Sequence, residues 1–265
     1  ANKDIDTILI TTQHNLHTQM VLDGLEAKKN IFVEKPLALS HEQLDTLFEK
    51  INLLQRQGIN FNFMVGYNRR FSPAVEAINK ITSQRSKPMI INYVMNAGFL
   101  PQDHWVHGEK GGGRNIGEAC HIYDLFTFFT QSEVASISAA SINCDSASTL
   151  SNDNFSAIIT FKDGSICNLI YTALGDSSYP KEKAEIFVDG KVIFLNNYNE
   201  VTVYENNRSK KIASRLSSKG YYEEFSAFFN EAGSGEHFPI PLWQIYQASK
   251  ISLDVEALIS KNAEI

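Results

Sequence analysis

Several short groups of polar residues in this sequence have types and spacings that suit proton transfer or the binding of a polar ligand. Glu34-Lys35-Pro36 directly follows an apolar run, Ile31–Val33, which is typical of a buried strand. Ligands of open α/β sheets bind at the carboxyl ends of strands, and a lysine there can be partly desolvated and exchange protons near neutral pH. The alternative is an ordinary surface turn with a solvated Glu–Lys pair.

A second group, Glu118, His121 and Asp124, recurs at three-residue steps in a segment that we predict to be a helix over 117–129. Side chains at this spacing share one face of an α-helix. An acid–imidazole–acid row can hold a histidine in a defined tautomer and prepare it for proton transfer. A structural histidine beside an apolar helix face is the equally weighted alternative.

The glycine run Gly111–Gly113 precedes this helix, but its spacing with Gly117 is GxGxxxG and no apolar strand comes before it. A phosphate-binding loop needs both a different spacing and a preceding strand. We therefore interpret the run as a flexible loop that leads into the helix.

His14 and His17 follow the end of another apolar run, and two histidines at this spacing could bind a metal. No third ligand lies nearby in the sequence, so we expect no metal site. A helix start capped by Asn15, with polar groups that contact the ribose or phosphate of a dinucleotide, fits these residues better.

Asn68-Arg69-Arg70-Phe71 forms the remaining charged cluster and comes directly after a third apolar run, Phe61–Val65. Arginines at the end of a sheet strand could clamp a phosphate or a carboxylate. The alternative is a salt bridge at a domain interface.

Length and composition limit the class of protein that could position these groups. The chain has 265 residues, of which 43% are hydrophobic, and a net charge of −6, which suits about two domains and argues against nucleic-acid binding. The sequence has neither an apolar run long enough to span a membrane nor a signal-peptide start. Three cysteines (Cys120, Cys144 and Cys167) without a CxxC motif indicate reduced, buried thiols and a cytoplasmic protein.

Hydrophobic patterning predicts two kinds of architecture along the chain. In residues 1–66, runs at 6–12, 31–33 and 61–65 alternate with helices, and Ser40 with Gln43 forms a capping box before the second helix. This alternation is typical of a doubly wound parallel sheet. Residues 67–265 contain a helix near 73–81, the helix over 117–129, seven strands between Met89 and Tyr204, and two closing helices. Asp163-Gly164 and Asp189-Gly190 mark hairpins, so we predict an α+β domain with a large, open and mainly antiparallel sheet.

Taken together, these motifs resemble the glucose–fructose oxidoreductase/inositol dehydrogenase family, usually written Gfo/Idh/MocA. The matching residues, in chain order, are Thr11-Thr12 with His17, Glu34-Lys35-Pro36, Gly66-Tyr67-Asn68-Arg69-Arg70-Phe71, and Gly111-Gly112-Gly113 through His121 to Asp124. Asn96–Phe99, Asp103-His104-Trp105 and Tyr171–Asp176 are similar to the branch fused behind a zinc-type alcohol dehydrogenase module in polysaccharide-biosynthesis proteins.

The resemblance implies an NAD- or NADP-dependent hydride transfer at a secondary alcohol of a sugar, cyclitol or nucleotide-sugar. It makes Lys35 and His121 the catalytic residues and the Lys35–Pro36 peptide bond cis. Cofactor-binding residues would be Thr11, Thr12, His14, His17, Glu34, Lys35, Asn68 and Arg69. Substrate-binding residues would be Arg70, Asn96, His104, Trp105, Arg114, Glu118 and Asp124.

The chain departs from the family pattern in two places. Many members have an aspartate four residues before the histidine, where this chain has Gly117, followed by Glu118. The strand–GxGxxG–helix start of the dinucleotide-binding domain does not occur either, and two βαβ units would need about 60 residues upstream of Ala1. We therefore expect residues 1–66 to be the C-terminal half of that domain and this chain alone to bind cofactor weakly.

Two functions follow as hypotheses. The first is an enzyme fragment that acts on a small sugar or nucleotide-sugar. The second is a non-catalytic sugar-binding or dimerisation module, which has no chemical reason to keep Lys35 and His121. An open antiparallel sheet leaves one face without helices, so we also expect a homodimer through that face.

Overall fold

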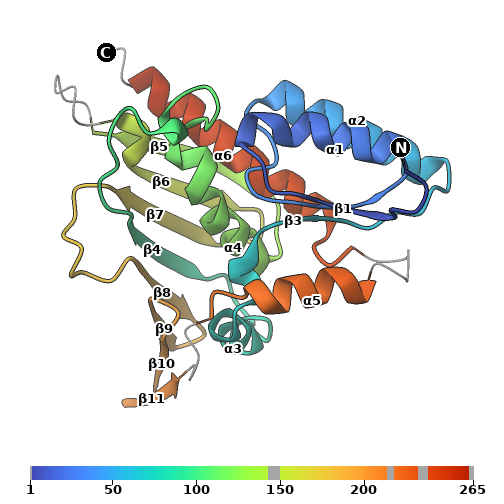
Figure 1. Ribbon diagram of the computed structural model, residues 1–265. Coiled ribbons are helices and arrows are strands. Elements are labelled where there is room, and N and C mark those ends of the chain that lie inside the picture. Colours follow the sequence, from blue (N-terminus) through green and yellow to red (C-terminus); the bar gives the residue numbers. More distant parts are fainter. Residues whose placement is uncertain (1, 143–149, 214–217, 232–237, 263–265) are drawn as a thin grey trace.

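The computed structural model describes residues 2–142, 150–213, 218–231 and 238–262 of the chain. A small sheet near the N-terminus has three parallel strands in the order β1-β2-β3 (Figure 1). Its strands are β1 (Thr7–Ile10), β2 (Asn30–Val33) and β3 (Phe63–Val65). Short β-branched and aromatic runs form these strands because both sheet faces are covered. The predicted parallel sheet is confirmed.

Helices α1 (His17–Glu26) and α2 (His41–Arg56) lie on one side of the small sheet, and α5 (Tyr221–Glu231) lies on the other (Figure 1). Phe32 of β2 stacks on Phe225 of α5, with ring centroids 4.7 Å apart. Ser40 caps α2, as predicted, because its side chain accepts a hydrogen bond from the backbone N–H of Gln43. This contact shows that α5, from the C-terminal part of the chain, completes the hydrophobic core around the small N-terminal sheet.

The large sheet has eight strands in the order β11-β10-β9-β8-β4-β7-β6-β5. They are β4 (Ile90–Asn96), β5 (Val134–Ser141), β6 (Asn154–Phe161), β7 (Ile166–Thr172), β8 (Glu182–Val188), β9 (Lys191–Asn196), β10 (Glu200–Glu205) and β11 (Arg208–Ala213). Neighbouring strands are antiparallel except for the parallel pair β4 and β7. Both predicted Asp-Gly hairpins are present, between β6 and β7 and between β8 and β9.

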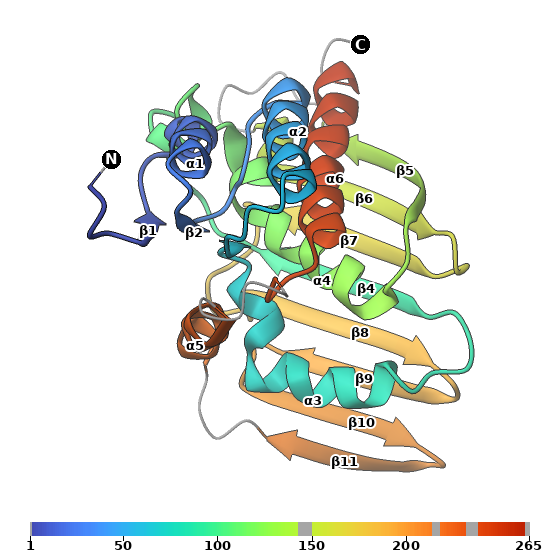
Figure 2. The ribbon, with the colours of Figure 1, turned by 90° about the vertical axis from the view of Figure 1, so that its right-hand side faces the viewer.

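Three helices, α3 (Pro73–Thr82), α4 (Cys120–Thr130) and α6 (Leu242–Asn262), cover one face of the large sheet (Figure 2). Helix α6 contributes to both hydrophobic cores: Ile251 packs in the core of the large sheet, and Ile245 packs in the core of the small sheet. This shared helix fixes the two sheets relative to one another. Within the described residues, no helix combines the length and the apolarity that a bilayer crossing requires.

Two local predictions need correction, one strand is absent from the prediction, and the cysteine prediction is tested for two of three cysteines. Helix α1 begins after a 3₁₀ turn over His14–Leu16 (η1) and has Leu16 rather than Asn15 at its N-cap. The helix predicted over 117–129 begins instead with a π-helical turn, Asn115–Ala119 (η4), which runs into α4. Strand β11 was not predicted. Cys120 and Cys167 are free, buried thiols, as expected, whereas Cys144 lies outside the described residues.

Candidate active site

A cavity of about 320 Å³ lies beyond the carboxyl end of β2, between the small sheet and the start of α4. Eight of the predicted site residues line it: His14, Lys35, Arg69, His104, Trp105, Arg114, Glu118 and His121. The remaining lining residues, which the sequence did not suggest, are Leu100, Val106, Gly117, Lys181, Lys219 and Tyr221. Residues from widely separated parts of the sequence therefore converge on one cavity.

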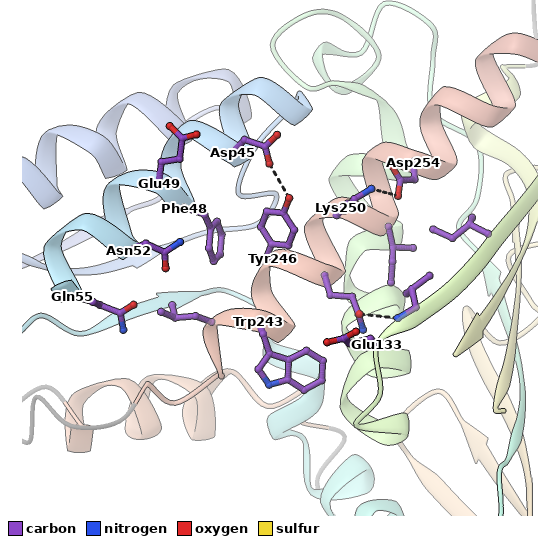
Figure 3. Close-up of a pocket in the computed structure, with 15 residues that line it drawn as sticks. Asp45, Phe48, Glu49, Asn52, Gln55, Glu133, Trp243, Tyr246, Lys250 and Asp254 are labelled. Atoms are coloured by element: carbon purple, nitrogen blue, oxygen red, sulfur yellow. Dashed lines mark hydrogen bonds and ion pairs between the residues drawn. The ribbon is translucent and has the colours of Figure 1, made fainter. Parts of the chain in front are cut away.

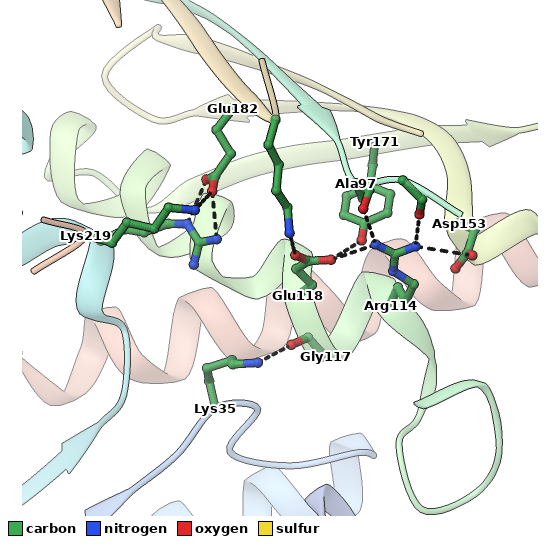
Figure 4. A network of polar contacts seen from close by, with 12 residues as sticks. Lys35, Ala97, Arg114, Gly117, Glu118, Asp153, Tyr171, Glu182 and Lys219 are labelled. Carbon is green, nitrogen blue, oxygen red and sulfur yellow. Dashed lines mark hydrogen bonds and ion pairs between the residues drawn. The ribbon is translucent and has the colours of Figure 1, made fainter. Parts of the chain in front are cut away.

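Lys35 enters the cavity from the end of β2. Its ammonium donates a hydrogen bond of 2.7 Å to the carbonyl oxygen of Gly117, which lies in the π-helical turn before α4 (Figure 4). The Lys35–Pro36 peptide bond is cis, as the resemblance implies. The lysine is therefore held between the two sheets rather than extended into solvent.

His17 supports this loop from behind instead of reaching the cavity. Its side chain is fully buried, with Nδ1 2.8 Å from the carbonyl oxygen of Pro36 and Nε2 3.1 Å from that of Thr12. Because both ring nitrogens face backbone carbonyls, His17 has no polar atom left for a cofactor. The expected contact between His17 and a cofactor is therefore corrected. His17 instead holds the backbone at Thr12 and Pro36 in position.

His121 lies in the first turn of α4 and is 5% exposed. Its Nδ1 atom is buried and has no hydrogen-bond partner among the described residues. Burial lowers the pKa of His121 well below its ordinary value, and the positive charges of Arg69 and Lys35 lower it further. The imidazole is therefore neutral near pH 7 and able to accept a proton.

The predicted acid–imidazole–acid row does not form. Glu118 accepts hydrogen bonds from Arg114, Tyr171 and Lys181, whereas Asp124 binds Arg70. No hydrogen bond within the described residues joins either carboxylate to His121. Three-residue steps align side chains in an α-helix, but the wider π-helical turn at Glu118 breaks that alignment.

Gly117, the position where many family members have an aspartate, has no room for a side chain. A Cβ atom there would come within 2.9 Å of Cε1 of His14. The His14 ring is held in place by its Nδ1, 2.8 Å from the carbonyl oxygen of Gly111, and by an edge contact with Trp105. His14 thus occupies space that an acidic side chain at this position would need.

The two arginines after β3 bind carboxylates of the protein itself rather than being left free to clamp a ligand. Arg69 lines the cavity but makes two hydrogen bonds to the buried carboxylate of Glu182, at 2.8 and 3.0 Å. Arg70 is buried and binds Asp124 and Gln244. Neither Arg70 nor Asp124 lines the cavity, so the expectation that they bind substrate is corrected: they form a buried ion pair at the junction of the sheets.

The other predicted residues lie around the cavity rather than in its wall. Thr11 and Thr12 are exposed after β1, and Glu34 is half-buried beside Gly66. Asn68 donates a hydrogen bond of 2.8 Å to the carbonyl oxygen of Lys219, and Asn96 donates one of 2.8 Å to that of Asp176. The two asparagines hold loops in place. Among the described residues, no three of His, Cys, Asp and Glu gather as metal ligands would.

A larger hollow of about 900 Å³ lies elsewhere, between α2 and α6 (Figure 3). Some of its polar groups pair with one another: the hydroxyl of Tyr246 donates to Asp45, and Lys250 binds Asp254. No histidine, cysteine or unpaired lysine lines it among the described residues. We therefore assign the chemistry to the smaller cavity, which holds Lys35 and His121.

Two family models match the chain. One is described as an oxidoreductase family with an NAD-binding Rossmann fold and matches residues 1–61, and the other is the GFO/IDH/MocA C-terminal domain and matches residues 86–193. The oxidoreductase YrbE of Bacillus subtilis is 30% identical over 180 residues, which are 62% of this chain and 47% of that protein. Myo-inositol 2-dehydrogenase of Thermotoga maritima is 23% identical over 245 residues, which are 88% of this chain and 71% of that protein.

A solved structure shows the same fold. UDP-N-acetylglucosamine 3-dehydrogenase of Acidithiobacillus ferrooxidans superposes with a TM-score of 0.78 at 18% identity, over 97% of this chain and 80% of that chain. The present chain therefore spans about half the length of the first relative named above and most of the solved structure. The two family models, in the expected order and over both sheets, show that this chain belongs to the Gfo/Idh/MocA family of oxidoreductases.

Proposed function

We propose that the chain provides the catalytic groups of an NAD- or NADP-dependent dehydrogenase that transfers a hydride at a secondary alcohol of a sugar, cyclitol or nucleotide-sugar. The observation that carries the proposal is the meeting of Lys35 and a neutral His121 in one cavity at the carboxyl edge of the small sheet. Its support from comparison is the NAD-binding description of the matching family and the activity named for the inositol relative.

The residues present fit a nicotinamide cofactor. His121 lines the cavity together with Lys35, and its Nδ1 atom has no hydrogen-bond partner among the described residues, which suits a reacting hydroxyl group placed next to a hydride acceptor. Thr11, Thr12 and Glu34, at the carboxyl ends of β1 and β2, would hold the cofactor. When bound, such a cofactor supplies the acceptor for the hydride that leaves the carbinol carbon.

His121 would take the hydroxyl proton as the carbon loses its hydride. A positioned general base contributes about 10²–10⁴-fold to a rate. Lys35 would place its positive charge beside the oxygen as negative charge develops there, which lowers the energy of that state. The hydrogen bond from Lys35 to Gly117 fixes the ammonium before the substrate arrives.

The proposal is tested by titrating NAD⁺ and NADP⁺ into this chain, and into any longer gene product that contains it, by calorimetry. The next step is to screen neutral and charged sugars and cyclitols for reduction of the bound nicotinamide. Turnover that disappears in His121→Gln supports the enzyme. Sugar binding without cofactor binding or turnover in every form of the protein would favour the non-catalytic module instead.

A homodimer through the open face of the large sheet is a further part of the proposal. Large apolar side chains on this face are exposed, including Ile158, Ile166, Ile170 and Phe187. Cross-strand register through β4 places them on the same side of β6, β7 and β8, away from the helices. Exposed apolar side chains gathered on one face are typical of an interaction site. The cytoplasmic location and the role in polysaccharide biosynthesis stay predictions from the sequence.

A further inference from the structure

The wall of the proposed active site carries more positive than negative charge. Its described lining residues include five cationic side chains, Lys35, Arg69, Arg114, Lys181 and Lys219, and one carboxylate, Glu118. His121 adds no charge near neutral pH because its pKa is lowered. A cavity with walls of one sign concentrates ligands of the opposite sign.

Glu118 cannot neutralise the cations on its side of the cavity. Its carboxylate lies 2.7 Å from the ammonium of Lys181 and 3.1 Å from the guanidinium of Arg114. Burial opposes ionisation of Glu118, but Lys181, Tyr171 and Arg114 outweigh it and lower the pKa of Glu118 to about 2. Arg114 also lies 3.7 Å from the carboxylate of Asp153, whose pKa is raised by burial, so two cations on this side face two carboxylates.

The surplus of positive charge arises on the opposite wall, around Glu182. This fully buried carboxylate binds Arg69 at 2.8 Å and Lys219 at 2.6 Å (Figure 4). The loop that carries Lys219 is fixed by the hydrogen bond from Asn68 to its carbonyl oxygen. On this side two cations therefore share a single carboxylate.

Lys35 brings a further positive charge, and no carboxylate among the described residues lies within ion-pair distance of it. Lys181 and Lys219 retain access to solvent, with 41% and 28% of their side chains exposed. Both ammonium groups can therefore turn toward a ligand that enters the cavity. The aromatic rings of Trp105 and Tyr221, which also line the cavity, offer flat surfaces for a sugar ring.

We propose that the substrate is a monosaccharide-sized polyol that bears an anionic group, which Lys181 and Lys219 bind at the mouth of the cavity. This inference rests on the proposed function, because it takes the cavity as the substrate site. The volume of about 320 Å³ is at the small end of ligand pockets and suits one sugar ring. Neutral hexoses and neutral cyclitols would leave the surplus positive charge of the cavity uncompensated.

The test measures binding without turnover, so that it does not depend on the dehydrogenase activity. D-glucuronate, D-glucose 6-phosphate and D-glucose are titrated into the protein by calorimetry at two salt concentrations. We expect at least one of the two anionic sugars to bind about tenfold or more tightly than D-glucose, as charge-assisted hydrogen bonds require. The difference between glucuronate and the phosphate shows whether a carboxylate or a phosphate is the preferred anion.

Variants of Lys181 and Lys219 test whether these two lysines cause the preference for anionic sugars. Lys181→Gln and Lys219→Gln should each weaken binding of the preferred anionic sugar about tenfold, and together they should abolish its advantage over D-glucose. Lys210→Gln, an exposed lysine on β11, is the matched control and should change nothing. Equal binding of neutral and anionic sugars, no binding of either anionic sugar, or an anion preference that survives the double variant would overturn the inference. Anionic binding without turnover would instead refute only the proposed dehydrogenase.

Discussion

The ammonium of Lys35 lies 2.7 Å from the carbonyl oxygen of Gly117, four residues before His121 in the sequence. This contact joins the end of β2 in the small sheet to the π-helical turn that starts α4 on the large sheet. The carbonyl oxygen of Gly117 can accept this hydrogen bond because the wider π-helical turn leaves it directed at the cavity. The two groups proposed to act on one hydroxyl are thus positioned by opposite sides of the junction between the sheets.

Replacing Lys35 should remove activity and leave the fold intact. Lys35→Met eliminates the positive charge beside the developing alkoxide, and we expect kcat to fall by about 10²–10³-fold. Lys35→Arg should also fail, because a planar guanidinium does not occupy the position of an ammonium. Initial rates measured beside thermal unfolding test this, with Lys210→Gln as the control. Retention of wild-type rates would exclude Lys35 from catalysis.

The rate of alcohol oxidation should be insensitive to pH through the range where an ordinary histidine titrates. Burial, followed by the charge of Arg69, holds the pKa of His121 well below 6.5. The neutral base is therefore fully present above that range and is lost only at lower pH. In a profile of kcat/KM against pH, we expect the acidic fall to lie well below 6.5.

Lys219→Gln provides the matched comparison for this profile. Lys219 is among the positive charges that lower the pKa of His121, so its removal should move the acidic fall to higher pH. His121→Gln should lower the rate and abolish the fall. An acidic limb near the ordinary histidine value in the wild-type protein would contradict the assignment of His121 as a buried neutral base.

Much of the fold was predictable because alternation and turn chemistry are local properties. The seven predicted strands of the large sheet and both Asp-Gly hairpins are present. Strand β11 was missed since Arg208–Ala213 has charged rather than alternating apolar residues. It is an edge strand held by pairing with β10. The signal that could have found it is Asn206-Asn207, both with positive φ, at the turn between the two strands.

The candidate site was less predictable because its polar groups meet only through tertiary structure. Strand-end placement and helical spacing marked Lys35 and His121 as candidates, the family resemblance implied their roles, and the cavity brings them together. Lys181 and Lys219 lie on loops without a motif, so no local pattern could mark them. The alignment expected for Glu118 failed because spacing alone does not distinguish a π-helical turn from an α-helical one.

A charge on the open face of the large sheet should separate the proposed dimer. Ile170 is 50% exposed at the centre of β7, and Ile170→Lys would place an ammonium in the apolar interface. Sedimentation velocity should show a dimer for the wild-type protein and a monomer for this variant. Leu53→Lys, at a 47% exposed position on α2, should remain dimeric. A monomeric wild-type protein would refute the interface.

Removing the ionisable group of Glu224 should stabilise the protein in neutral and alkaline solution. Glu224 is 1% exposed, and burial, with the charges of Glu34 and Asp124, raises its pKa from 4.5 to about 9. The unfolded chain ionises at the lower value, so the stability that the neutral acid provides is present below pH 4.5 and is lost as pH rises toward 9.

Glu224→Gln should therefore remove this loss and raise the free energy of unfolding by up to about 3 kcal/mol at pH 7. Urea unfolding at pH 5, 7 and 8 is the measurement, and the gain should increase with pH. Glu223→Gln, at a half-buried neighbouring position on α5, is the control and should lack the trend. A gain that does not depend on pH would show that Glu224 is ionised in the folded protein.

Asp124 should matter for stability far more than for catalysis. Its side chain is fully buried and accepts a hydrogen bond of 2.9 Å from Nε of Arg70, whose side chain is itself only 4% exposed. Asp124→Asn leaves that guanidinium buried without its counter-charge, which typically costs about 3–5 kcal/mol. We expect a large decrease in the unfolding midpoint and, below it, a kcat within a few fold of wild type.

The double variant Arg70→Met with Asp124→Leu separates the cost of a broken pair from the value of the pair. Replacing both charges with apolar groups of similar volume leaves no buried charge, so much of the lost stability should return. If Asp124 instead supported the tautomer of His121, as an acid–imidazole row would require, Asp124→Asn would lower kcat strongly at temperatures where the protein is fully folded. The double variant would then stay inactive despite its recovered stability, because no carboxylate would be present to orient the imidazole.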